Sequence, residues 1–243
     1  MGSPDTSLPE QDESEFIAAP WHTAAVVLLL LGIAVLSAWR ASEAVPATGN
    51  ARIVSYGMVL VWEWLTVAFI AWGVRRRDHP LASLIGGSWA TGRAILRDVG
   101  IAVLFLIGSS MILGLLQFAL RNRPTLAVRN LLPQTALETV VWILLAATAG
   151  FCEEIIFRGY LQQQLGCIAH NPIAGLFLQA VAFGVCHGYQ GTKSMFVLAV
   201  YGCLFGLLAR QQRSLRPGMV AHFLQDGVGG LVLREMLKKL PAG

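Results

Sequence analysis

The chain has 243 residues, of which 55% are hydrophobic and 13% are charged. Soluble domains usually carry about 25% charged residues, so the composition excludes an ordinary soluble domain and predicts a polytopic membrane protein. The formal net charge of +4 comes from Arg and Lys clustered between apolar runs, which suits anionic headgroups. No basic stripe interleaved with aromatic residues is present, so we expect no nucleic-acid partner.

The amino-terminal segment, residues 1–23, is predicted to be a disordered acidic tail. It contains Ser, Pro and several carboxylates but no Lys or Arg, a composition that cannot form a packed core. It also lacks the basic region that begins a signal peptide. The acidic residues are Asp5, Glu10, Asp12, Glu13 and Glu15.

Apolar runs dominate the remainder of the chain. They cover residues 24–39, 53–73, 99–120, 136–157, 172–187, 194–209 and 217–233. A helix needs ~20 residues to cross ~30 Å of hydrocarbon, so several of these runs are short. We predict an all-α, polytopic transmembrane helical bundle of about seven spans. Residues 24–135 would hold the amino-terminal spans, and residues 136–243 would form a four-helix membrane bundle with a short basic tail.

Two topological questions stay open. Residues 81–97 mix three glycines and two arginines with Leu, Ile and Trp, which fits either an interfacial segment or an ordinary loop. With seven spans, the 18 Lys and Arg residues divide evenly between the two sides of the membrane. The positive-inside rule therefore gives no orientation.

The four cysteines lie in or beside apolar runs without C-x-x-C spacing. This pattern is typical of packed, reduced thiols and not of a disulfide or a metal site. The residues are Cys152, Cys167, Cys186 and Cys203.

Adjacent glutamates end the fourth apolar run. Glu153 and Glu154 stand at its polar end, and Arg158 follows one turn after the second. Carboxylates at membrane depth are costly and indicate function. Glu154 and Arg158 are spaced i,i+4 in the favourable order, so a salt bridge explains both. Around the helix axis, the Glu153 side chain points about 100° away from that of Glu154, and it has no local partner. It is either a surface carboxylate or a general base whose basicity the apolar surroundings increase.

Two further motifs occur on later runs. Phe183 and His187 are one turn apart on the fifth run, and His222 and Asp226 are spaced i,i+4 on the last. Either histidine alone would be explained by helix packing. If the fourth run stays helical up to the following turn, Glu153 lies about 18 Å and His187 about 22 Å below that turn. Asp226 fits this depth, whereas His222 requires a tilt, a later helix start or a kink. We therefore expect one polar pocket in the last four spans.

The ordered set of motifs resembles a known family. The motifs are Glu153-Glu154-x-x-x-Arg158, Phe183-x-x-x-His187 and His222-x-x-x-Asp226. In this order on consecutive apolar runs they resemble the CPBP intramembrane proteases, which include the type II CAAX prenyl endopeptidases and bacteriocin self-immunity proteins. The resemblance covers residues 136–233. The CAAX enzymes have asparagine where this chain has Asp226.

The resemblance implies hydrolysis of a peptide bond in or near the membrane. Glu153 would be the general base that activates a water together with His187, while His222 and Asp226 would hold that water or stabilise the tetrahedral intermediate. A charged Asp226 would oppose an oxyanion, so it would either be protonated or orient His222. The residues expected to support the site are Glu154, Arg158 and Phe183.

Metal dependence is a separate question. Histidine and carboxylate side chains are zinc ligands, and the family is often described as metalloproteases. However, the chain has no H-E-x-x-H motif, and the candidates lie on three different helices. We expect no cofactor; the alternative is a single zinc bound by His187, His222 and Glu153.

Two other classes of function stay open. A transporter or proton relay would also place ionisable residues in the membrane, and would include Glu63 and Glu138 in its pathway. A non-catalytic membrane immunity or scaffold protein would use the fold only to bind a partner. For the protease, the expected partners are the lipid bilayer and a membrane protein or lipidated peptide substrate. We expect an integral multi-pass protein of the plasma membrane; the sequence does not specify whether its substrate is prenylated.

Overall fold

The computed structural model describes residues 15–42 and 49–239. Within these ranges the chain contains helices and no β-strand, which confirms the all-α class. The elements are α1 Pro20–Ser42, α2 Gly49–Arg75, α3 Leu81–Ile85, α4 Gly92–Ala119, α5 Leu126–Leu131, α6 Ala136–Glu153, η1 Glu154–Leu161, α7 Gln162–Ile168, α8 Pro172–Cys186, η2 Gly188–Gln190, α9 Thr192–Gln212 and α10 Arg216–Lys239. The predicted acidic tail lies largely outside the described residues, and α1 begins at Pro20, four positions before the predicted run.

Five helices in the described part of the chain are long and apolar enough to cross a membrane. They are Pro20–Ala41, Asn50–Arg75, Gly92–Ala119, Ala136–Ile168 and Thr192–Gln212. The other two predicted spans differ from these five. Helix α8 has only 15 residues, and α10 has 24 residues but a more polar composition. The polar residues of α10 include His222 and Asp226, which are expected at the site, and also Gln225, Arg234 and Glu235; together they make its apolar run weaker.

The outer surface of the bundle is apolar. Large side chains on the spanning helices are exposed, among them Leu28, Leu104, Leu115 and Phe118. A soluble protein rarely exposes apolar surface of this extent, whereas hydrocarbon solvates it. Together with the five apolar helices, this surface indicates a multi-pass membrane protein.

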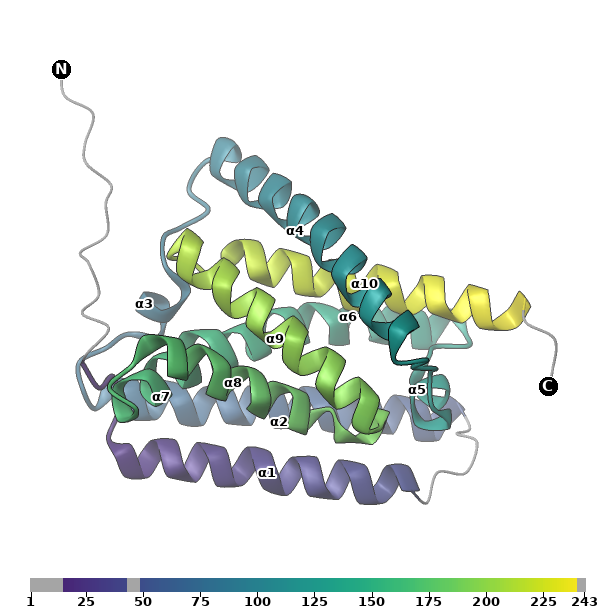
Figure 1. Cartoon of the computed structure of the whole chain (residues 1–243), viewed down its shortest axis with the longest axis horizontal. Coiled ribbons are helices and arrows are strands. Elements are labelled where there is room, and N and C mark those ends of the chain that lie inside the picture. The colour runs from purple at the N-terminus through teal and green to yellow at the C-terminus, as the bar shows by residue number, and fades with distance from the viewer. Residues whose placement is uncertain (1–14, 43–48, 240–243) are drawn as a thin grey trace.

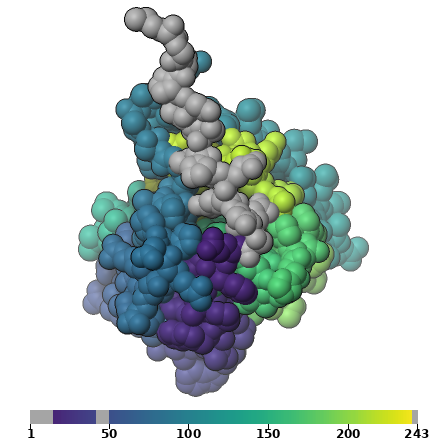
Figure 2. All heavy atoms as spheres, turned by 90° about the vertical axis from the view of Figure 1, so that its left-hand side faces the viewer, coloured from purple at the N-terminus to yellow at the C-terminus, as the bar shows by residue number. Residues whose placement is uncertain are grey.

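The predicted interfacial segment divides into two parts. Residues Leu81–Ile85 form the short helix α3, and α4 begins at Gly92, capped by the Thr91 side chain. Arg93 and Arg97 therefore belong to the first turns of a spanning helix. Figure 2 shows the start of α1 in purple, between the blue connection that follows α2 and the green helices α7 and α8.

The carboxyl-terminal helices pack as a group, and α2 covers one side of it. Helix α10 packs against α6, α9 and α4, while α8 lies against α9 and α7 (Figure 1). Helix α2 packs against α6 and η1. Glycines allow these close approaches: a Cβ on Gly202 of α9 would lie 3.0 Å from the Cα of Ala180 in α8. Gly202 therefore lets α9 approach α8 closely.

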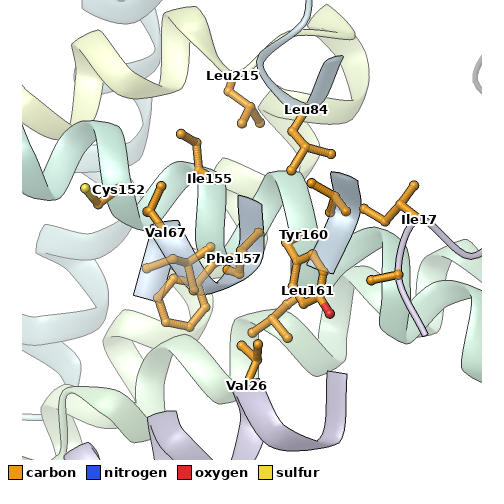
Figure 3. Packing of buried hydrophobic residues seen from close by; sticks show 14 of the residues in the cluster. Ile17, Val26, Val67, Leu84, Cys152, Ile155, Phe157, Tyr160, Leu161 and Leu215 are labelled. Carbon is orange, nitrogen blue, oxygen red and sulfur yellow. The ribbon is translucent and has the colours of Figure 1, made fainter. Parts of the chain in front are cut away.

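One long helix passes through the centre of the core. Helices α6, η1 and α7 run continuously from Ala136 to Ile168, and all eight residues of the π-helical segment η1 are buried. Figure 3 shows Val67 of α2 beside Cys152 and Ile155 of this helix, within the main apolar cluster. A π-helical turn widens the backbone and is frequent at functional sites. Here it begins at Glu154, the second glutamate of the motif.

The four cysteines are free, as predicted. Cys152 and Cys167 are buried, and Cys186 and Cys203 are partly buried. They pack in the helix core like small apolar residues.

Candidate active site

Glu154 lies at the centre of a buried ionic network. Its side chain has no exposed surface, and its Oε1 accepts a hydrogen bond from Nη1 of Arg158 at 2.9 Å. This confirms the predicted i,i+4 pair. The same oxygen lies 3.0 Å from Nδ1 of His222. An ionised Glu154 can only accept, so Nδ1 of His222 donates. The sequence did not predict this second contact, which joins η1 to α10.

His222 also faces the other predicted carboxylates. Its Nε2 lies 3.6 Å from Oε2 of Glu153 and 3.5 Å from Oδ2 of Asp226. The Glu153 side chain is 19% exposed and that of Asp226 is 41% exposed, whereas His222 is buried. Trp142 of α6 donates a hydrogen bond from Nε1 to the Asp226 carbonyl at 3.1 Å, which fixes this part of α10. One imidazole therefore joins three acidic side chains.

Close helix contact makes this arrangement possible. A Cβ on Gly150 of α6 would lie 2.8 Å from the carbonyl oxygen of Met219 in α10. A Cβ on Gly218 would lie 2.9 Å from Oε2 of Glu154. Real Cβ contacts are essentially never this short, so both positions require glycine as packed. The two glycines bring the backbones of α6 and α10 together where His222 meets the glutamates.

His187 joins the site through an aromatic side chain. It follows the last residue of α8, and its Nδ1 lies 2.8 Å from the carbonyl oxygen of Phe183. The carbonyl can only accept, so Nδ1 carries the proton and Nε2 is left as an acceptor. The Phe183 ring centroid lies 4.6 Å from that of His187 and 6.1 Å from that of His222. Within the described residues, no hydrogen bond or ion pair joins His187 to Glu153.

Arg158 is held between aromatic rings. Its Cζ lies 4.4 Å from the ring centroid of Phe183 and 4.8 Å from that of Phe205. The Phe205 ring in turn lies 5.3 Å from the imidazole of His222. Such cation–π contacts stabilise a desolvated guanidinium. Phe183 has the supporting position that was predicted for it.

Sequence reasoning missed Phe205 as a residue of the site. Phe205 is fully buried in α9, but an aromatic residue in an apolar helix gives no signal of its own. The only signal in the sequence is the neighbouring Gly206, where α9 packs tightly against α7 and α8. Tyr189 of η2 was missed for the same reason; its ring lies 6.0 Å from that of His187.

The two glutamates of the transporter hypothesis occupy different surroundings. Glu63 of α2 is 8% exposed and interacts electrostatically with Glu153, His222 and Asp226. Glu138, at the start of α6, instead accepts a hydrogen bond from Arg52 at 2.8 Å and completes a helix cap. Glu63 thus lies beside the site, whereas Glu138 belongs to a separate ion pair.

The proposed zinc ligands are not arranged around one point. Among the described residues, no group of three His, Cys, Asp or Glu side chains is placed to hold a metal ion. Both nitrogens of His222 face carboxylates, and Nδ1 of His187 faces a backbone carbonyl. A tetrahedral site needs its donors to converge at about 2 Å from the metal, so the residues as arranged do not fit zinc.

These features define a helical membrane protein with a buried cluster of glutamate and histidine at a π-helical turn. The family model described as type II CAAX prenyl endopeptidase Rce1-like matches residues 135–228. That segment is therefore similar to the Rce1-like type II CAAX prenyl endopeptidases, and it contains all seven motif residues. It begins beside α6 and ends within α10. No curated protein and no solved structure matches the chain.

Proposed function

We propose that the protein is an intramembrane endopeptidase that hydrolyses a peptide bond in a membrane-associated protein or peptide, with Glu153 as its general base. The observation that carries the proposal is the meeting of Glu153, His222 and Asp226 inside the segment that matches the Rce1-like family model. Glu153 is partly exposed and has no local ion pair of its own, so a water and a substrate can reach its carboxylate.

In this mechanism each proton has a donor and an acceptor. Glu153 takes a proton from water as the water oxygen attacks the carbonyl carbon, and the C–N bond then breaks. Glu153 passes this proton to the Nε2 of His187, which is left as an acceptor because Nδ1 donates to the Phe183 carbonyl, and Nε2 then delivers the proton to the leaving amine. Imidazole exchanges protons near neutral pH. Glu153 and His187 would thus act on the same water from different helices.

His222 would stabilise the tetrahedral intermediate. With its Nδ1 hydrogen-bonded to Glu154, its Nε2 is directed toward Glu153 and Asp226. A protonated Nε2 would donate to the developing oxyanion. The Asp226 side chain is 41% exposed, and its Oδ2 lies 3.5 Å from Nε2 of His222. We therefore prefer the second role considered for Asp226, that of orienting His222.

The proposed chemistry uses no resident metal. Because the donor set does not converge, no step is routed through zinc. The transporter alternative also loses support, because Glu63 and Glu138 do not share one set of surroundings. We propose a plasma-membrane location and a membrane protein or lipidated peptide as substrate.

A cleavage assay tests this function. The detergent-purified protein is incubated with membrane-anchored peptides, with and without a prenyl group, and cut sites are read by mass spectrometry. We expect cleavage at a defined bond and an unchanged rate after chelation and dialysis. Absence of cleavage across the panel would contradict the protease assignment. A chelator-sensitive rate that zinc restores would support the metal alternative.

A further inference from the structure

Helix α2 carries a buried carboxyl group that the mechanism above does not use. Glu63 is 8% exposed, and its Oε2 has no hydrogen-bond partner in the part of the chain that the structure describes. It lies within a membrane-spanning helix, and outside the segment that matches the family model. A buried, unpaired carboxylate costs several kcal/mol, so its presence requires a reason.

The packing of α2 directs this part of the helix toward the active site. The ring of Trp64, next to Glu63, stacks on Phe151 of α6 at a centroid distance of 5.6 Å. One turn after Glu63, Val67 packs in the cluster that contains Cys152 and Ile155 (Figure 3). These contacts flank Glu153 on the facing helix. Glu63 is therefore held at the level of the catalytic glutamate.

Among the described residues, the groups that interact with Glu63 include no lysine or arginine. Its electrostatic partners are Glu153 of α6, His222 and Asp226 of α10, Cys152 of α6 and Tyr189 of η2. Arg158, the nearby cation, is committed to Glu154 and to the aromatic rings. Only the imidazole of His222 can offset negative charge here, and Glu154 and Asp226 already contact it.

Two carboxylates in one site of low dielectric cannot both be ionised, as the paired aspartates of aspartic proteases illustrate. Glu153 is the more exposed of the two, since 19% of its side chain is accessible, and its Oε2 lies 3.6 Å from His222. The negative charge is therefore best placed on Glu153, and the proton on the more buried Glu63.

We propose that Glu63 is a second carboxyl group of the active site and shares a single proton with Glu153. The inference rests on the proposed function of Glu153 as base. Glu63 acts through Glu153 and does not touch the reacting water, so it is a positioning residue. Its proton stays within the pair while Glu153 accepts the proton of water and passes it on toward the leaving amine.

Identical substitutions at the two glutamates distinguish their roles. Glu63→Gln replaces a neutral acid by a neutral amide of the same shape, so its rate should stay within about tenfold of the parent. Glu153→Gln should lose about 10² to 10⁴ in rate. In the parent, activity should fall at alkaline pH as the shared proton is lost; in Glu63→Gln this fall should move to a different pH, set by the loss of the His222 Nε2 proton alone. A purely structural Glu63 would leave the pH profile unchanged.

Glu138→Gln is the matched control, because Glu138 is an equally buried glutamate in a separate ion pair. It should lower folded yield and leave the alkaline limb as in the parent. The proposal is overturned if Glu63→Gln loses turnover like Glu153→Gln, or if its alkaline limb lies at the same pH as in the parent.

An infrared measurement tests the pair without a substrate. At neutral pH the parent should show the C=O stretch of a protonated carboxyl group, and Glu63→Gln should lack it. If Glu63→Gln does not fold, Glu63→Asp replaces it in this test, and the C=O band should then shift in frequency. A parent without the band at neutral pH contradicts the shared proton. A parent that shows the band but cleaves no peptide contradicts the proposed function instead.

Discussion

Helix α6 has a buried glutamate, Glu138, in its first turn and ends at the partly exposed Glu153, and the two ends differ in how their glutamates are hydrogen-bonded. At the start, both oxygens of Glu138 are used. Oε1 accepts from Arg52 at 2.8 Å, and Oε2 accepts from the backbone amides of Gln134 and Thr135 at 2.5 and 3.2 Å. Thr135 completes the capping box in return. Such a fully bonded carboxylate holds α2 and α6 in place.

At the other end the bonding is incomplete. Oε2 of Glu153 and Oε2 of Glu154 are buried without a hydrogen-bond partner among the described residues, as are Nε and Nη2 of Arg158. Buried polar groups are normally satisfied. The difference teaches that the oxygens of Glu138 are all used in holding the fold, whereas the glutamates at the proposed site keep unused acceptors, in Glu154 as well as in the proposed base Glu153.

The largest expected effect is at Glu153. The Glu153→Gln variant keeps the size of the side chain but no longer accepts a proton near neutral pH, so turnover should fall by about 10² to 10⁴. Because no structural bond is lost, thermal stability in detergent should match the parent. Rates on a validated peptide and melting curves measure both. Cleavage near the parental rate would mean that Glu153 is not the base.

The next effect is at the buried ion pair. Glu154→Ala and Arg158→Ala each leave a buried charge without its partner, which costs about 3–5 kcal/mol. We expect a lower folded yield for both variants, measured by size-exclusion chromatography, and a loss of activity in the molecules that fold. Glu154→Ala also removes the partner of His222 Nδ1. Normal yield with full activity would show that the pair supports neither the fold nor the site.

A smaller effect, on stability alone, is expected at the start of α6, where both oxygens of Glu138 are hydrogen-bonded. Glu138→Gln removes the charge that Arg52 contacts and should cost about 1.5–3 kcal/mol, the usual value of a charged hydrogen bond. The melting temperature should fall, while the rate per folded molecule should not. A loss of rate without a loss of stability would remove the distinction between the two ends of the helix.

The smallest effect is expected at Asp226, whose exposed side chain lies at the edge of the cluster. Partly solvated ion pairs contribute about 0–1 kcal/mol, so Asp226→Asn should change the rate by less than about tenfold. Asparagine can still hydrogen-bond to His222 and stands at this position in the CAAX enzymes. A drop as large as that of Glu153→Gln would show that the charge of Asp226 takes part in the reaction.

Much of the site was predictable because its signals are local. The i,i+4 spacing of Glu154 and Arg158 fixes their contact once a helix forms, and the same spacing places Asp226 near His222. The order of the three motifs led to the family resemblance that the match to residues 135–228 confirms. The catalytic roles of the individual residues stay predictions.

The span count was predictable only in part. Hydropathy detects a span as a long apolar run. Helix α8 is too short for this pattern, and α10 is long enough but too polar. Both carry site residues: His187 follows α8 directly, and His222 lies in α10. Polar side chains needed for chemistry reduce the signal by which a membrane helix is recognised.

By itself the sequence determined the membrane class, the helices and the pairs within a helix, because apolar composition and spacing along one helix act locally. Only the tertiary structure decided which residues meet between helices. It brought Nδ1 of His222 to Glu154, placed Phe205 beside Arg158, separated Glu63 from Glu138 and, among the described residues, left no group of three possible metal ligands around one point. These contacts depend on how closely α2, α6, α9 and α10 approach one another at their glycines, and on where the π-helical turn widens the backbone. No periodicity in the sequence encodes that approach.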